Sequence, residues 1–336
     1  MRPNAPQARS LDPHAFVSFR NLGSNHLVGI SPQMFKRILV PLDGTAESNV
    51  ALPLVRAIAK TTGGSIWLLR VARESAIPDD HGSTHAAAIS IERIAEELAS
   101  SGIDVHPVTR EGYPSQEILH LSSEIAADVI VMRTHGRAGL ERAVFGSVAE
   151  DVFKTSRIPL LVLRPGGRRV SSIQKLLVPV DGSPGGSMAL QTALQVARAT
   201  GASIDVLEVV VPVPMLAFAA PYDYSGAPFY DPVWDDDALL AARTYVDAVA
   251  ERLRGVGLAV DAYARMAPDV VRAIVDTAEH ASADMIVMST HALTGPARAL
   301  LGSVADAVVR TSHCPVLLVK RAHGSAPESD LEMPPQ

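Results

Sequence analysis

The sequence predicts an α/β fold in which two tandem domains each hold a doubly wound, five-stranded parallel sheet. Two observations carry this prediction: the chain repeats itself once, and in each copy short apolar runs alternate with segments of helical periodicity. The apolar runs are rich in Val, Ile and Leu and lack polar alternation, which is typical of strands covered on both faces. A length of 336 residues fits two domains of about 100–200 residues each.

The repeat defines the domain boundaries. Its clearest segments match pairwise, namely 37–45 with 175–183, 127–132 with 283–288, and 146–164 with 302–320. Each copy is too long for a solenoid repeat and suits a small domain. We therefore predict domain 1 at 35–165 and domain 2 at 172–322, joined by the turn-rich, charged linker 165–169.

The elements of domain 1 follow from its apolar runs and helical patterns. Strands are predicted at 37–42, 65–71, 104–109, 128–133 and 159–164, and helices at 46–61, 85–101, 114–125 and 143–156. Pro114 and Pro184 stand where a first helical turn would begin, a position that tolerates a missing N–H. Alternation of this kind predicts right-handed crossovers and a doubly wound sheet.

Three segments lie outside this pattern. Residues 1–34 lack periodicity and are expected to be a disordered extension, or to precede a translation start further downstream; the polar tail 323–336 is also expected to be disordered. Domain 2 carries an insertion at 211–237 with a concentration of aromatic residues. Such a loop serves as a lid or partner surface, or packs its rings on the neighbouring domain, and both roles stay open.

Composition excludes several classes of function. A net charge of −6 without a Lys/Arg stripe argues against nucleic-acid binding. No apolar run reaches the ~20 residues of a membrane span, so a cytoplasmic protein is expected.

Cys314 is the single cysteine and is expected to be a buried hydrophobe rather than a reactive thiol. His135 and His291 recur at matching places without a second ligand nearby, which favours loop packing over metal binding.

Two loops of each domain are candidates for chemistry, because open parallel sheets bind ligands beyond the carboxyl ends of their strands. The first loop follows strand 37–42 and contains Asp43, which can accept hydrogen bonds from ribose hydroxyls or an adenine amine, or can cap the following helix. The second follows strand 128–133. Its Gly136 and Gly146-Ser147 can bring backbone N–H groups and a helix N-terminus to an anion, or can serve as ordinary turn residues.

Other catalytic motifs are missing from the sequence. It has neither a G-x-x-x-x-G-K-[ST] phosphate loop nor a dinucleotide G-x-G-x-x-G after a strand. It also lacks a Ser/His/Asp elbow motif. The first loop reads Asp43-Gly44-Thr45, whereas adenylyl-transferring or ammonia-using enzymes of related architecture need a Ser-Gly-Gly-x-Asp-Ser or H-x-G-H loop.

These features together resemble the universal stress protein family. The resemblance rests on Leu-Val-Pro-x-Asp-Gly-[TS] at the start of each copy and on Met-x-Thr-His-[GA] followed by Gly-Ser-Val-Ala. It covers about 280 of the 336 residues. It implies a Rossmann-like, adenine nucleotide alpha hydrolase-like fold and dimerisation through the last strand. ATP-binding members carry G-x-x-G-x9-G-[ST] after the fourth strand.

Carried over residue by residue, the resemblance implies a nucleotide site in each domain. In domain 1 the expected contacts are Pro41, Asp43, Val71, Met132, Arg133, Gly136, Gly146, Ser147 and Val148. In domain 2 they are Asp181, Val209, Gly302 and Ser303. Both domains depart from the pattern: Arg133 replaces its first glycine in domain 1, and Ser289 and Ala292 stand at the glycine positions of domain 2, with Pro296 nearby. Arg133 either crowds the phosphates or pairs with them as a cation.

The resulting expectation is a stress-response regulatory protein that binds ATP, with or without Mg²⁺, mainly in domain 1. It is not expected to be an enzyme, although slow ATP hydrolysis stays open. The alternative is a nucleotide-free scaffold with vestigial pockets. The apolar last strands, 159–164 and 315–320, would be sheet edges that need cover. We expect the two domains to pair through them, with a homodimer possible and with no nucleic-acid or membrane partner.

Overall fold

A computed structural model describes residues 34–45, 48–72, 81–134, 146–164, 166–212, 233–290 and 302–320. Nearly all of the expected extension 1–34, most of the insertion 211–237 and the whole tail 323–336 lie outside these residues. Five residues singled out in the sequence also lie outside them, namely His135, Gly136, His291, Ala292 and Pro296.

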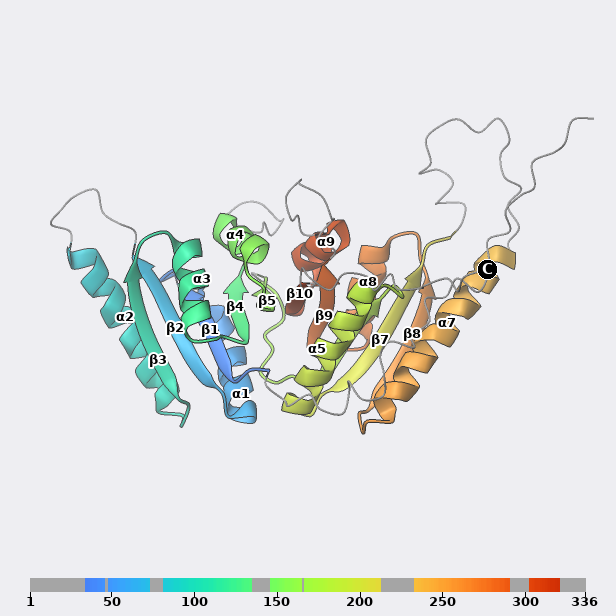
Figure 1. The fold of residues 1–336 in the computed structure, drawn as a ribbon, viewed down its shortest axis with the longest axis horizontal. Coiled ribbons are helices and arrows are strands. Elements are labelled where there is room, and N and C mark those ends of the chain that lie inside the picture. The colour runs from blue at the N-terminus through green and yellow to red at the C-terminus, as the bar shows by residue number, and fades with distance from the viewer. Residues whose placement is uncertain are drawn as a thin grey trace, which may run out of the picture. The chain divides into compact units, whose positions relative to one another are not determined.

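Both domains have the predicted order of elements (Figure 1). Domain 1 consists of β1 (Arg37–Leu42), η2 (Ser48–Ala51), α1 (Leu52–Thr62), β2 (Ser65–Ala72), α2 (His81–Ala99), β3 (Val105–Glu111), α3 (Pro114–Glu124), β4 (Val129–Arg133), α4 (Ser147–Thr155) and β5 (Leu160–Leu163). Domain 2 consists of β6 (Lys175–Val180), α5 (Pro184–Thr200), β7 (Ser203–Val210), α7 (Val233–Arg254), β8 (Val260–Met266), α8 (Val270–His280), β9 (Met285–Thr290), α9 (Ser303–Thr311) and β10 (Val316–Lys320).

The predicted elements agree with the structure to within two residues except at three helix starts. The helix expected at 85–101 is α2, which begins four residues earlier, at His81. The helix expected from residue 46 begins as the 3₁₀ turn η2, and α1 starts at Leu52. Pro53 explains this start, because without an N–H it cannot continue an α-helical ladder from earlier residues. The helix expected from residue 143 begins at Ser147, because Gly146 has extended backbone. As predicted, α3 and α5 begin at their prolines.

The strands form one ten-stranded sheet in the order β3-β2-β1-β4-β5-β10-β9-β6-β7-β8. Within each domain all pairs are parallel, and the two domains join through an antiparallel pair in which Val316 lies opposite Val162 and Leu317 opposite Leu161. The direction of winding reverses between β1 and β4 in domain 1 and between β6 and β9 in domain 2. These are the two topological switch points, where a doubly wound sheet leaves a crevice for a ligand.

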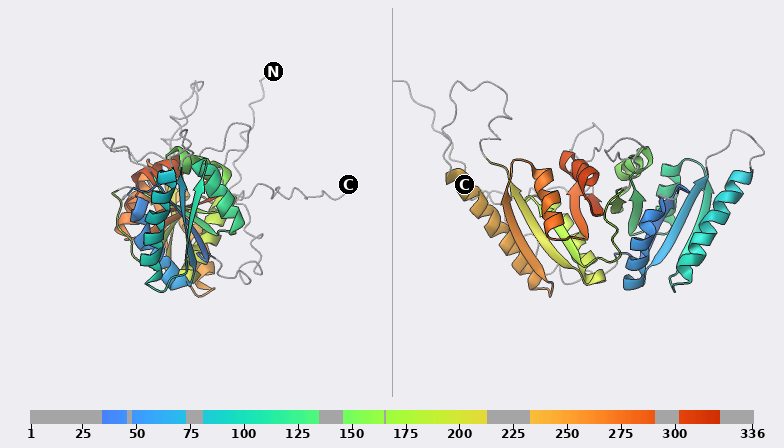
Figure 2. Two further views of the ribbon diagram at one scale, coloured as in Figure 1. Left: turned by 90° about the vertical axis from the view of Figure 1, so that its left-hand side faces the viewer. Right: turned by 180° about the vertical axis from the view of Figure 1, so that it is seen from behind.

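Helices cover both faces of the sheet, which is why the strands carry continuous apolar runs. On one face α1, α2, α5 and α7 pack against residues such as Ile38, Val40 and Val178, and on the other α3, α4, α8 and α9 pack against residues such as Leu39 and Ile130. Figure 2 shows the two helical layers when the sheet is seen from its side. Each apolar cluster extends through both domains.

The repeated Ala-Asp pair before the fourth strand has a structural role. The Asp128 carboxylate accepts hydrogen bonds from the backbone N–H groups of Phe35, Lys36 and Arg37, at 2.6–3.0 Å. In domain 2 the Asp284 carboxylate accepts from Gln174 and Lys175. Each carboxylate therefore fastens the entry of a domain's first strand to its fourth, at the edge of the sheet opposite the switch-point crevices.

Candidate functional site

The first candidate site lies at the switch point of domain 1. β1 and β4 are adjacent and parallel there, with Ile38 opposite Val129 and Leu39 opposite Ile130. The segments that follow these strands therefore leave the sheet side by side at its carboxyl edge. Asp43 follows β1 directly, and Met132 and Arg133 end β4. The sheet order thus places Asp43 and the end of β4 at the same edge of the sheet.

The Asp43 carboxylate is exposed and held in a defined turn. Its Oδ1 accepts a hydrogen bond from the Thr45 backbone N–H at 2.9 Å and another from the Thr45 hydroxyl at 2.6 Å. Thr45 in turn accepts from the Ser48 N–H through its carbonyl and its hydroxyl oxygen, at 3.1 and 3.2 Å. These contacts fix the loop against the first residue of η2, so Asp43 is presented at the crevice in a preformed orientation.

Arg70 closes over the same loop, although the sequence reasoning did not single it out. Its Nη1 donates to the Leu42 carbonyl at 3.2 Å. Its guanidinium atoms lie 2.7–2.8 Å from the point that a Cβ on Gly44 would occupy. Gly44 has φ +80°, and its missing side chain is what lets the guanidinium come this close. A cation therefore lies on the backbone next to Asp43.

The predicted residues that follow the fourth strand belong to the end of β4 and the start of α4. Met132 is buried and Arg133 is partly buried at the end of β4. Gly146 is the N-cap of α4, and Ser147, its first residue, is exposed. Among the described residues no side-chain hydrogen bond caps this helix, so its first N–H groups and its dipole can serve an anion. Val148 packs on the core and anchors the first turn.

Two apolar residues complete the predicted set in domain 1. Val71 is partly buried near the end of β2, on the face covered by α3 and α4. Pro41 is partly buried in β1, opposite Leu69. Both belong to strands next to the crevice and can supply apolar surface to a flat ring. The predicted Gly136 lies outside the described residues, so its place in the crevice stays a prediction.

Domain 2 repeats the framework of this site. Asp181 follows β6, and its Oδ1 accepts from the Ser183 N–H at 3.0 Å. The Ser183 side chain caps α5 by accepting from the Gly186 N–H. Gly302 is the N-cap of α9, which begins at the exposed Ser303. Val209 is partly buried in β7. The four predicted residues of domain 2 thus occupy places equivalent to Asp43, Gly146, Ser147 and Val71, in a separate crevice.

The residue opposite the end of the first strand carries opposite charge in the two domains. Arg70 pairs in register with Leu42, the last residue of β1, and Glu208 pairs with Val180, the last residue of β6. Burial, and then the nearby charge of Asp181, raise the pKa of Glu208 above its ordinary value. Glu208 therefore stands where domain 1 has a cation and adds to the negative charge of Asp181.

The hydroxyl of Tyr245, on α7, is affected by the same two carboxylates. Burial, together with the charges of Glu208 and Asp181, raises the pKa of the Tyr245 hydroxyl to about 12. The two carboxylates and the phenol are thus close enough to affect one another's ionisation. Arg70 and Glu208 each interrupt an apolar strand at the same place in the repeat. Aligning the two copies of the repeat would therefore have pointed to both residues. Tyr245 gives no comparable signal, because only packing brings α7 to this crevice.

Two negative findings apply to the described part of the chain. No group of three or more His, Cys, Asp or Glu side chains in it is placed to hold a metal ion. No helix in it combines the length and apolar character needed to cross a membrane. The Cys314 thiol is buried, with 7% of the residue exposed, and burial raises its pKa, which agrees with the prediction of a small hydrophobe.

The fold defines a class: tandem doubly wound α/β proteins with one topological switch point in each domain. Within that class, a model of the universal stress protein family matches residues 34–164 and 172–320. The chain belongs to the universal stress protein family, as the sequence motifs indicated. The family model matches the chain twice in tandem, so each half of the repeat is a complete domain of this family.

Individual relatives agree with this assignment. Universal stress protein MJ0531 of Methanocaldococcus jannaschii is 30% identical, over 42% of this chain and 88% of its own length. A universal stress protein of Mycolicibacterium smegmatis is 23% identical over 84% of this chain and 96% of its own length. The crystal structure of a universal stress protein from Archaeoglobus fulgidus covers 86% of this chain and 99% of its own, with a TM-score of 0.64 and 21% identity. This last likeness shows the shared fold.

Proposed function

We propose that this chain is a stress-response regulatory protein that binds ATP in the crevice of domain 1. The proposal is supported by three features at the carboxyl edge of the domain 1 sheet. They are a fixed carboxylate, Asp43, a cation on the neighbouring backbone, Arg70, and the N-terminus of α4, for which no side-chain capping hydrogen bond is present in the described residues. A nucleotide needs these groups together: hydrogen-bond acceptors for sugar and base, and positive potential for phosphates.

Each residue has a definite part in this proposal. Asp43 accepts hydrogen bonds from the ribose hydroxyls or the adenine amine, while Val71, Pro41 and Met132 supply apolar surface to the base. The amides at Gly146-Ser147, the Val148 turn and the Ser147 hydroxyl receive the phosphates. The glycine of the family pattern at Gly136 would let the backbone approach them. ATP, free or as its Mg²⁺ complex, is the proposed ligand.

Domain 2 is proposed to bind nucleotide weakly or not at all. Glu208 and Asp181 place two carboxylates at its crevice, and Ser289 stands where domain 1 has Arg133. A polyphosphate that approaches this crevice meets like charge instead of Arg70. Asp181, Val209, Gly302 and Ser303 keep the framework without the favourable charge. The asymmetry therefore arises from side chains at the strand ends and not from the backbone.

The proposed role is regulatory rather than catalytic. The described segments beside the switch point carry the carboxylate of Asp43, whose Oδ1 is engaged by Thr45, and that of Glu150 in the first turn of α4, which pairs with Lys154. The crevice therefore offers no general base poised for an attacking water, and hydrolysis is expected to be slow. Bound nucleotide would instead set the conformation of the loops at the carboxyl edge, and with it the choice of partner.

One observation favours the alternative, a nucleotide-free scaffold. Arg133 occupies the place of the first glycine of the ATP-binding pattern and is partly buried at the end of β4. A side chain held across the phosphate path would leave the pocket vestigial. The continuous sheet through β5 and β10 would then be the functional feature, as a rigid platform that presents two similar surfaces.

The experiment that separates the two proposals uses the full chain. One sample of protein purified without added nucleotide is denatured, and its supernatant is analysed for released adenine nucleotide. A second sample, folded and freed of any bound nucleotide, is titrated with ATP by calorimetry. Asp43→Asn and Asp181→Asn form a matched pair, because each is isosteric and keeps an acceptor for its turn. We expect Asp43→Asn to weaken ATP binding at least tenfold and Asp181→Asn to leave it unchanged. Absence of released nucleotide and of titratable heat in the wild type would support the scaffold.

A further inference from the structure

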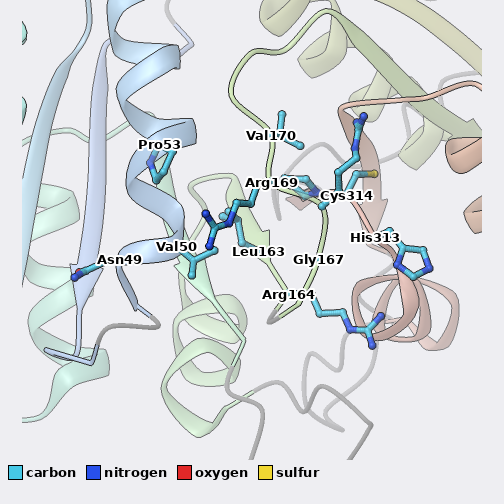
Figure 3. Close-up of a pocket in the computed structure, with 12 residues that line it drawn as sticks. Asn49, Val50, Pro53, Leu163, Arg164, Gly167, Arg169, Val170, His313 and Cys314 are labelled. Carbon is cyan, nitrogen blue, oxygen red and sulfur yellow. The ribbon is translucent and has the colours of Figure 1, made fainter.

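A cavity of about 220 Å³ lies at the junction of the two domains, and its lining residues differ from those predicted at the switch points (Figure 3). Its walls come from η2 and α1, from the end of β5 with the linker that follows, and from the segment that leads into β10. The cavity therefore exists because β5 and β10 pair, and neither domain forms it alone.

The lining of this cavity is basic. Arg164, Arg168, Arg169 and His313 line it, and no Asp or Glu is among the described residues that do so. Two of the arginines are positioned by backbone carbonyls: Arg164 Nη1 donates to Thr311 at 3.2 Å, and Arg168 Nη2 donates to Ala283 at 2.6 Å. These contacts fix positive charge around the cavity before any ligand arrives.

Part of that charge is uncompensated. Arg168 also forms an ion pair with Asp284, at 2.9 Å, which neutralises its guanidinium. Arg169 has no hydrogen-bond or ion-pair partner within the described ranges of the chain, and its side chain extends from the linker toward Val50 (Figure 3). Arg164 is bonded to the Thr311 carbonyl and extends toward His313 (Figure 3). The cavity therefore offers the Arg169 guanidinium to a ligand, with the charge of Arg164 nearby.

The remaining lining is largely apolar. Val50 and Pro53 come from domain 1, Leu163 from the end of β5, Val170 from the linker and Pro315 from the approach to β10. A hydrated inorganic ion would leave this surface in contact with water, whereas a ligand with an apolar body would cover it. The volume is below the ~300–1,000 Å³ of pockets for drug-sized molecules, so the ligand is compact.

A neighbouring cavity lacks the combination of arginines and apolar residues that lines the first. It measures about 360 Å³, lies on the other side of the linker and shares Gly167, Arg168, His313 and Cys314 with the first. Its lining contains the carboxylate of Glu279 and lacks Arg164 and Arg169. The larger cavity is therefore not predisposed to an anion, and volume alone does not select the site.

We infer that the junction cavity is a binding site for a small organic anion, a single carboxylate or phosphate monoester carried on a short apolar body. The oxyanion would be received by Arg169, since a guanidinium group pairs with a carboxylate or phosphate through two parallel hydrogen bonds. The body would lie against Val50, Leu163 and Val170. The inference does not depend on nucleotide binding in domain 1, because its residues are distinct from Asp43, Arg70 and α4.

The test measures binding of four probes to the full chain by ligand-observed NMR titration: phenyl phosphate, benzoate, inorganic phosphate and the uncharged benzyl alcohol. Phenyl phosphate or benzoate should bind more tightly than both inorganic phosphate and benzyl alcohol, because only they join charge to an apolar body. The stronger of the two identifies the oxyanion. Equal binding of benzyl alcohol, or of inorganic phosphate, would overturn the inference.

Variants then locate the site. Arg169→Gln should weaken binding of the better probe about tenfold, the loss expected for one charge-assisted contact. Val50→Asp should weaken it at least as much by placing a carboxylate in the wall, and the 39% exposure of Val50 makes this change compatible with folding. Arg93→Gln, at an exposed position on α2, and Arg70→Gln are the controls. Loss of binding in Arg70→Gln but not in Arg169→Gln would place the anion in domain 1 and refute the proposed cavity site.

Discussion

Arg70 and Glu208 occupy the same position in the two halves of the molecule, each opposite the last residue of its domain's first strand. In domain 1 the guanidinium lies on Gly44 and binds the Leu42 carbonyl. In domain 2 the corresponding carboxylate is close enough to Asp181 to be affected by its charge. Two crevices with the same backbone framework therefore differ in the sign of the charge beside the ligand loop.

This contrast predicts how ATP binding responds to charge changes. Arg70→Gln removes the cation next to Asp43 and should weaken ATP binding about fivefold to tenfold, in line with one interaction with a charged group. Glu208→Gln is the matched change in domain 2 and should leave the tight site unaffected while it strengthens any weak second site. Calorimetry of both variants at low and moderate salt measures this. If both variants lost ATP affinity equally, the tight site could not be assigned to domain 1.

The contact between Arg70 and Gly44 can be tested by a second matched pair. Gly44→Ala and Gly182→Ala each place a side chain at a positive φ, +80° and +70°, and each should lower the free energy of unfolding by about 1 kcal/mol. The new methyl group at residue 44 would also displace the Arg70 guanidinium, whereas nothing lies within 4 Å of the methyl at residue 182. Chemical denaturation should therefore give similar losses, and only Gly44→Ala should also weaken ATP binding. Unchanged ATP affinity in Gly44→Ala would argue against a role for Arg70.

Lys320 predicts a pH dependence at the domain junction. Its ammonium lies 4.5 Å from the ring centroid of Phe153 in the other domain, and burial lowers its pKa from 10.5 to about 8. Between pH 8 and 10.5 the unfolded chain binds more protons at this residue than the folded chain, so its contribution to stability rises with pH through that window. Lys320→Met should abolish this rise in urea unfolding measured at pH 7.5 and 10. A difference between wild type and variant that is the same at both pH values would contradict the prediction.

The aromatic contact opposes the effect of burial. A ring face attracts the ammonium and not the neutral amine, so Phe153 keeps the pKa of Lys320 higher than burial alone would. Phe153→Leu should therefore lower the pKa of Lys320 below about 8. Heteronuclear NMR of the lysine side chain during a pH titration measures this directly. A pKa that rises in the variant would show that the ring acts mainly by excluding water.

Asp205 predicts an opposite dependence at lower pH. This buried carboxylate pairs with Lys175 at 3.6 Å, and burial raises its pKa above the ordinary value. The folded chain then binds more protons than the unfolded chain between the two pKa values, so stability falls as pH rises through that range. Asp205→Asn should be at least as stable as wild type at pH 7, with the difference vanishing toward acidic pH. Thermal or urea unfolding across pH 4–7 checks this.

The partner of Asp205 supplies the control. Lys175→Met leaves the buried carboxylate without its cation and should lower stability by about 1–3 kcal/mol at pH 7, less than for a fully buried pair because Lys175 is one-third exposed. The double variant with Asp205→Asn should recover most of this loss. If both single variants are destabilised equally and the double variant does not recover, the ion pair is not the source of the effect.

Much of the fold could be read from local pattern. Strand runs such as 37–42 and the prolines at 114 and 184 act through nearest neighbours, and the structure confirms them. The start of α1 was predicted too early because the effect of Pro53 on the preceding turn was not weighed. In the candidate site, the motifs indicated Asp43 and Gly146-Ser147, whereas Arg70 and Glu208 were missed because strand register decides what lies beside the ligand loop.

The sequence alone determined the duplication, the α/β class and the family, because repeats and periodicities are properties of residue order and do not depend on which segments meet in space. Only the tertiary structure decided which charges share a crevice and that a basic cavity lies between the domains. Arg70 meets Gly44, and Arg169 meets Val50, through pairing of strands and packing of segments that are remote in sequence. Electrostatic interactions depend on distance in space, and that distance is fixed only when the sheet is assembled.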